Sequence, residues 1–106
     1  MKNDNIPSCE SLNGIRFRTN PDFMLREIGG EAVLIPLVSE GPLVNAVISL
    51  NESGLWLWKQ FETPHTAQEV LQQARKEFSD DGTMEQDIYN FVIAHRQADL
   101  LIEEEL

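Results

Sequence analysis

The chain has 106 residues and a net charge of −10, from 18 acidic and 8 basic side chains. Its length suits one domain with a single core, and its hydrophobic share of 42% is well above that of a disordered chain. Nucleic-acid binding requires clustered Lys and Arg, so this charge argues against such a partner. No apolar run approaches the length of a membrane span, and we expect a cytoplasmic protein with no membrane partner.

Residues that could support catalysis or bind a metal are few and scattered. The single cysteine, Cys9, is expected to be a free thiol in a reducing compartment. His65 and His95 are thirty positions apart and remote from Cys9, which does not suit a metal site, and each is expected to have a structural role. Ser49 and Ser53 have no base nearby in the sequence that could activate them. We therefore expect a binding module without catalytic residues, metal or cofactor.

The N-terminal residues 1–22 combine Asn, Ser, Pro, Gly and charged side chains with no sustained hydrophobic period. This composition predicts a flexible segment that is loosely attached to the domain. Ile15 and Phe17 alternate with Arg16 and Arg18, which leaves a short strand as the second alternative.

Three short strands are predicted next. The first is Phe23–Ile28, and a Gly-Gly pair suited to a tight hairpin turn connects it to a strand at 31–35. Pro36 ends that strand because it cannot donate to a ladder. A third strand is expected at 44–50, which completes an antiparallel sheet that needs helices on one face. An unpaired edge of this sheet must either be covered by another part of the protein or serve to bind another chain.

The hydrophobic period changes at Asn51, which is expected to be the N-cap of a helix over residues 52–61. Gly54 lies inside this helix at a cost in propensity of about 1 kcal/mol, so we expect another backbone to pack closely there. Trp58 falls on the core side. Trp56 points about 200° away around the helix and is therefore a candidate partner interface.

Two more helices follow, each opened by a predicted capping box: Thr66 with Glu69, and Thr83 with Gln86. The second helix is expected to bury a face that ends at Phe78. The third is expected to run to residues 100–102, with 103–106 as a frayed acidic tail. The order β-β-β-α-α-α predicts an α+β domain with helices on one side of a small sheet.

Residues 23–102 resemble the PqqD-like family, named for coenzyme PQQ synthesis protein D. The most specific element is the Leu-Asn-x-x-Gly junction, and two residues depart from the usual pattern: His95 replaces an aliphatic residue and Asp99 a Gly. The quoted motifs are Val33-Leu34-Ile35-Pro36 after a Gly-containing hairpin, Leu50-Asn51-Glu52-Ser53-Gly54 leading to Leu57-Trp58, Thr66-Ala67-Gln68-Glu69-Val70, Asp87-Ile88 with Phe91-Val92, and Leu100-Leu101.

The resemblance implies a winged-helix-like peptide chaperone for ribosomally made, modified peptides. Such a domain binds the leader segment of a precursor by strand addition and presents it to a modifying enzyme, often a radical SAM protein. The family serves many pathways, so PQQ biosynthesis is not implied as the specific pathway. A homodimer is left open.

The same resemblance implies a binding groove between the third strand and the third helix. The implied docking edge is Val44, Asn45, Ala46, Val47, Ile48, Ser49 and Leu50, and the facing wall is Asp87, Phe91, Ala94 and His95. The alternative role of Asp87 is an exposed acid in the first turn of the helix. The alternative role of Phe91 is a residue of the core.

Two other functions compete with leader binding. One is a transcription-type winged helix, which the acidic third helix disfavours because Arg96 is its sole Arg or Lys. The other is an adaptor that docks a larger enzyme through Trp56 and the helical face, without a leader peptide.

Overall fold

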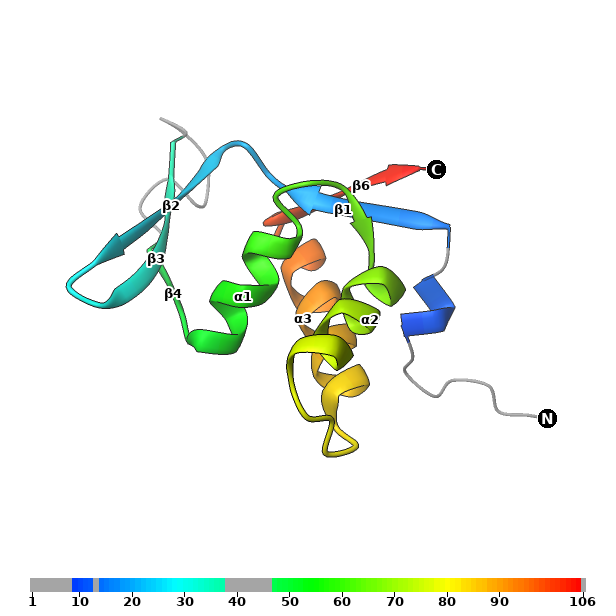
Figure 1. Ribbon diagram of the computed structural model, residues 1–106. Coiled ribbons are helices and arrows are strands. Elements are labelled where there is room, and N and C mark those ends of the chain that lie inside the picture. The colour runs from blue at the N-terminus through cyan, green and yellow to red at the C-terminus, as the bar shows by residue number, and fades with distance from the viewer. Residues whose placement is uncertain (1–8, 13, 38–46, 106) are drawn as a thin grey trace.

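The computed structural model describes residues 9–12, 14–37 and 47–105, and in these residues the chain is an α+β fold. Three helices and two three-stranded antiparallel sheets follow a short 3-10 helix (Figure 1). The elements in chain order are η1 (Cys9–Leu12), β1 (Ile15–Thr19), β2 (Phe23–Ile28), β3 (Glu31–Pro36), β4 (Ile48–Leu50), α1 (Glu52–Gln60), β5 (His65–Thr66), α2 (Ala67–Glu77), α3 (Met84–Gln97) and β6 (Leu101–Glu105).

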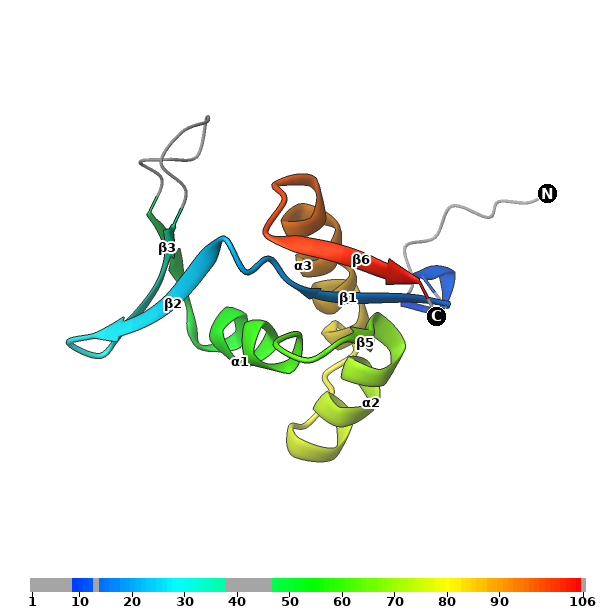
Figure 2. The ribbon, with the colours of Figure 1, turned by 90° about the horizontal axis from the view of Figure 1, so that it is seen from above.

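The first sheet has the strand order β2-β3-β4 and confirms the predicted hairpin. Gly29 and Gly30 make its turn with φ values of 59° and 84°, a region that glycine enters without strain. Phe23, Ala32 and Leu34 are buried on the inner face. The hairpin projects away from the helices (Figure 2). The third strand is shorter than predicted: β4 begins at Ile48, and residues 44–46 lie outside the described part of the chain.

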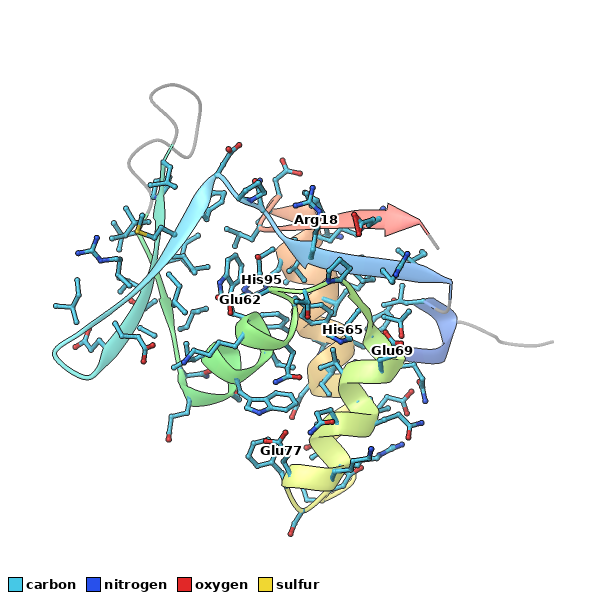
Figure 3. All side chains as sticks on the ribbon, turned by 45° about the horizontal axis from the view of Figure 1, so that its top comes forward. Arg18, Glu62, His65, Glu69, Glu77 and His95 are labelled. Atoms are coloured by element: carbon cyan, nitrogen blue, oxygen red, sulfur yellow. The ribbon has the colours of Figure 1, made fainter. Side chains whose placement is uncertain are left out.

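The second sheet, β5-β1-β6, corrects two predictions. Residues 1–22, expected to be flexible, contain β1, so the short strand held as the second alternative is confirmed. The acidic tail 103–106, expected to fray, supplies the last residues of β6, which pairs with β1 from Ile15↔Glu105 to Thr19↔Leu101. Phe17, at the centre of β1, is fully buried. Arg18, at the opposite face of that strand (Figure 3), forms an ion pair with Glu104 at 3.7 Å. Pairing with β1 thus orders a segment that was expected to fray, and a cross-strand ion pair lies at its surface.

The helices confirm the predicted core, with one exception. Trp58 and Phe61 are 2% and 0% exposed, and Gly54 is also buried. Phe78 was expected on the buried face of the second helix, but it is 50% exposed. It is the C-cap residue of α2 and has an extended conformation, φ −132° and ψ 157°, so it leaves the helical face.

All three helices begin where the sequence predicts, after Asn51, Thr66 and Thr83, but only two of the predicted side-chain caps form. The Asn51 side chain accepts from the Gly54 amide, and Thr66 forms a complete capping box with Glu69. Thr83 makes no side-chain cap. Its backbone lies in the helical region, φ −108° and ψ −7°, and not in the extended region of the other two caps, and its hydroxyl donates to Asp81 Oδ1 at 2.7 Å.

The third helix ends at Gln97, before the expected position, because the chain turns at Asp99. Asp99 has φ 61°, in the left-handed region, where the family pattern has Gly. Its amide donates to the Arg96 carbonyl at 3.1 Å, and the Leu100 amide donates to the His95 carbonyl at 2.8 Å. This pair of bonds is a Schellman motif with Asp at the position where glycine is favoured. It redirects the chain into β6.

Replacing Asp99 by Gly should relieve this conformational cost and raise the free energy of unfolding by about 0.5–1 kcal/mol. Urea unfolding measures the change. The matched control is Ala98→Gly: Ala98 has φ −90°, where glycine brings no conformational relief, so that variant should be less stable than the parent. A D99G variant no more stable than the parent would contradict the assignment of strain to this residue.

Candidate functional site

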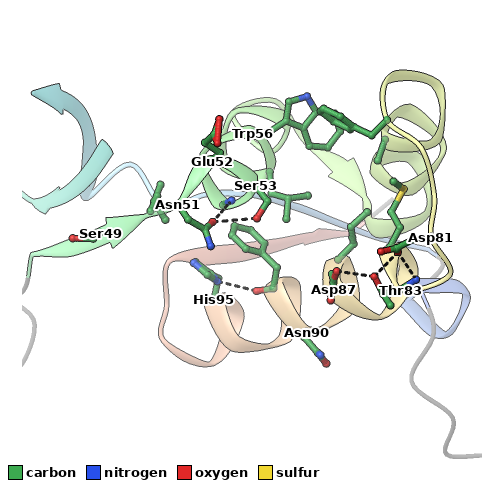
Figure 4. Close-up of a pocket in the computed structure, with 18 of the residues that line it drawn as sticks. Ser49, Asn51, Glu52, Ser53, Trp56, Asp81, Thr83, Asp87, Asn90 and His95 are labelled. Atoms are coloured by element: carbon green, nitrogen blue, oxygen red, sulfur yellow. Dashed lines mark hydrogen bonds between the residues drawn. The ribbon is translucent and has the colours of Figure 1, made fainter. Parts of the chain in front are cut away.

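A groove of about 850 Å³ lies where β4, both ends of the α2–α3 turn, α1 and α3 meet (Figure 4). It brings together residues from two stretches of chain: the β4–α1 corner and the segment from the end of α2 into α3. The lining residues are Ile48, Ser49, Leu50, Asn51, Glu52, Ser53, Gly54, Trp56, Leu57, Ala74, Phe78, Ser79, Asp81, Thr83, Met84, Asp87, Ile88, Asn90, Phe91 and His95.

One border of the groove is β4, an edge strand. It pairs with β3 through Leu34↔Ile48 to Ala32↔Leu50, and within the described residues it has no second strand neighbour. Ile48 and Leu50 are half-buried and pack against the core, whereas Ser49 is exposed. A strand with one free side presents unpaired backbone groups to an incoming chain.

The corner between β4 and α1 is fixed by the cap at Asn51. Its Oδ1 accepts from the Gly54 amide at 2.8 Å and from the Ser53 hydroxyl at 3.1 Å. A Cβ added at Gly54 would lie 3.1 Å from this same oxygen and 3.6 Å from Leu50 Cδ2. The expectation that another backbone segment packs closely against Gly54 is therefore wrong. Glycine is needed here because side chains of the corner itself occupy the space.

The facing wall belongs to α3. The rings of Phe91 and His95 stack with centroids 3.8 Å apart, and the His95 Nδ1–H donates to the Phe91 carbonyl at 2.9 Å. Phe91 also stacks on buried Phe61 at 6.4 Å. Burial lowers the pKa of His95 below its usual value, since charging the ring would cost solvation. At neutral pH this pair of stacked rings is therefore uncharged.

The far end of the groove is acidic. The Thr83 hydroxyl oxygen lies 2.7 Å from Asp81 Oδ1 and 3.3 Å from Asp87 Oδ2, so two carboxylates meet at one hydroxyl. Hydrogen bonds from the Thr83 side chain and amide hold the pKa of Asp81 below its usual value. In Figure 4, Asp81, Thr83 and Asp87 lie on the opposite side of the groove from Ser49, and His95 lies between the two sides.

Trp56 closes the groove from α1. It is half-buried, its ring packs edge-on against Phe78 at 5.3 Å, and its Nε1–H donates to Glu77 Oε1 at 3.2 Å. The candidate partner residue and the candidate strand edge, proposed separately from the sequence, therefore border the same groove.

The structure brings together only part of the predicted site. Ile48, Ser49, Leu50, Asp87, Phe91 and His95 line the groove. Val47 is 65% exposed, and neither it nor exposed Ala94 is among the lining residues. Val44, Asn45 and Ala46 lie outside the described residues.

Sequence reasoning missed Phe78, Asp81, Thr83 and Met84, which also line the groove. They belong to the α2–α3 connection, and no local pattern indicates that this turn lies opposite the start of α1. The nearest signal was the spacing of Thr83 and Asp87, four positions apart at a helix start.

The other residues considered for chemistry lie apart from one another in the described part of the chain. No group of three or more His, Cys, Asp or Glu residues there could hold a metal ion. Cys9 is a free, buried thiol whose Sγ lies 3.6 Å from the Glu85 carbonyl oxygen, and burial raises its pKa to about 11. His65 pairs with β1 and its Nδ1–H faces the Gln60 carbonyl at 2.9 Å. In residues 9–12, 14–37 and 47–105 no helix has the length and hydropathy needed to cross a bilayer.

A family model described as coenzyme PQQ synthesis protein D (PqqD) matches residues 31–101. This match covers more than half of the chain and every element that borders the groove. The chain belongs to the PqqD family. Membership indicates an accessory role associated with PQQ synthesis. Comparisons with curated proteins and with solved structures gave no match.

Replacing Asn51 by Ala should lower the free energy of unfolding by about 1 kcal/mol, because the Gly54 amide loses its acceptor. Asn51→Asp is the matched control, since a carboxylate also caps well and is favoured at a helix N-terminus. Thermal or urea unfolding measures both. Equal stability of the Ala and Asp variants would show that the cap contributes nothing to the corner.

The lowered pKa of His95 predicts a pH dependence of stability. The unfolded chain takes up a proton on His95 at a higher pH than the folded chain, so this contribution is present above about pH 6.5 and is lost as the pH falls. We expect unfolding between pH 7.5 and pH 5 to show a larger loss of stability in the parent than in His95→Gln. Gln97→Asn, a change at an exposed, non-titrating residue of the same helix, is the control and should keep the parent's pH slope. A slope unchanged by H95Q would refute this assignment.

Proposed function

We propose that this protein binds the leader of a ribosomally made precursor peptide as an added strand on β4 and presents the peptide to a modifying enzyme. The supporting observation is the coincidence of a strand with a free edge and a groove of about 850 Å³ beside it. Family membership supports an accessory role in which the chemistry is done by a partner.

Strand addition suits this geometry for two physical reasons. Backbone hydrogen bonds to β4 would supply affinity that is independent of sequence. Alternate side chains of the added strand would point into the groove, against Leu50, Leu57 and Phe91, and would supply specificity. A bound peptide would also remove the half-buried apolar side chains of the lining from water, which favours binding.

The modifying enzyme is proposed to be of the radical SAM type, as the family resemblance implies. Among the described residues, the groove lining reaches from β4 to the α2–α3 turn. A leader bound along it would leave its following core segment free to extend beyond the groove. The free core is what a modifying enzyme requires.

A second candidate is an adaptor that docks a larger enzyme through α1 and α2 without a leader. The exposed Phe78 ring beside Trp56 favours it, because exposed large aromatics mark partner surfaces. The two candidates differ in whether β4 is used. Because Phe78 also lines the groove, substituting it should weaken either partner, and only a bound peptide should slow the hydrogen exchange of the β4 amides.

To test leader binding, peptides that bind the protein are selected from a random displayed dodecapeptide library and mapped on ¹⁵N-labelled protein. We expect amide shifts at Ile48, Ser49 and Leu50 and along α3, and slower hydrogen exchange of the β4 amides, because strand addition protects them. Shifts confined to the free edges of β2 or β6, or no selected binder, would refute the proposal.

His95→Ala should weaken these peptides roughly three- to tenfold, since it removes half of the stacked pair on the groove wall. His65→Ala is the matched control: it also removes a histidine, but His65 is not among the groove-lining residues. Isothermal titration measures both. Equal losses in the two variants would indicate a stability effect and not a contact in the groove.

A further inference from the structure

We infer that the groove selects peptides in which an apolar residue is separated by about four positions from a Lys or Arg. This inference rests on the proposed function and defines the class of peptide that the site accepts. It depends on the order in which apolar and charged groups occur along the groove.

Among the described residues, the charged side chains that line the groove are acidic: Glu52, Asp81 and Asp87. His95, also in the lining, has a pKa lowered by burial, and its ring is stacked on Phe91. A groove that combines apolar side chains with carboxylates favours an occupant that combines apolar and cationic groups.

The carboxylates of Asp81 and Asp87 converge on the Thr83 hydroxyl at 2.7 and 3.3 Å. Like charges held this close gain from an intervening cation, which a Lys or Arg side chain can supply. The nearby Arg75 does not serve this purpose, because its Nε is paired with Asp80 at 3.0 Å and it is not among the lining residues.

The spacing follows from element geometry. Asp87 and His95 are eight residues apart on α3, which corresponds to about 12 Å along the helix axis. An extended peptide covers this length in about four residues at roughly 3.3 Å each. A peptide that places an apolar side chain against the His95 ring therefore reaches the Asp81–Asp87 pair with a residue three to five positions away. Either strand direction satisfies this spacing.

The selection from the dodecapeptide library tests this inference. Sequenced binders should be enriched in Lys or Arg three to five positions from an apolar residue. Their affinity for the Asp81→Asn/Asp87→Asn double variant should fall about three- to tenfold. The matched control is Glu31→Gln/Glu62→Gln, which removes two exposed acids that do not line the groove and should leave affinity unchanged.

The outcomes separate this inference from the proposed function. Binders that shift the β4 amides and are weakened by H95A, but lack the basic residue and tolerate the D81N/D87N change, would overturn the inference and leave leader binding intact. Basic peptides weakened equally by both double variants would overturn it as attraction to net charge. The absence of any binder at β4 would overturn both proposals.

Discussion

The fold and its groove depend on one buried ring, Phe61. It is fully buried at the C-cap of α1, packs edge-on against Phe17 of β1, and stacks on Phe91 of α3, both at centroid distances of 6.4 Å. Its carbonyl also accepts from the Thr19 amide at 2.9 Å. One residue thereby joins a helix end, a central strand and the groove wall, and aromatic pairs of this geometry add to the gain from burial.

The groove is a consequence of that packing. Phe91 is held from behind by Phe61, so its other face supports His95 within the groove wall. The opposite border, β4, is held at a fixed angle to α1 by the Asn51 cap and by the absence of a Cβ at Gly54. Two rigid borders on independent supports keep the space between them open, which favours a binding site over a collapsed core.

The distribution of charge distinguishes the groove from the rest of the acidic surface. In the second sheet, acids are neutralised within the chain: Glu103 pairs with Arg96, and Glu104 with Arg18. Asp81 and Asp87 instead meet at a neutral hydroxyl inside the groove. Some acids of this acidic chain are thus paired with Arg around the second sheet, whereas Asp81 and Asp87 contribute negative charge to the groove.

Local interactions determined what could be predicted from the sequence. The caps at Asn51 and Thr66, the Gly-Gly hairpin and the burial of Trp58 each depend on residues within a few positions of one another, so their signals are visible in the chain. The two borders of the groove, β4 and the wall with Phe91 and His95, were implied by the family resemblance and not by these local signals.

Tertiary structure decided the rest. Ile15 pairs with Glu105 across almost the whole chain, so the acidic sequence of β6 did not reveal a strand, and the alternation in β1 supported a strand only as the second alternative. Asp81, Thr83 and Phe78 reach the groove only because α2 and α3 pack together and bring their connecting turn against the start of α1. Contacts between distant segments depend on how the whole core packs, and a single stretch of sequence carries no record of them.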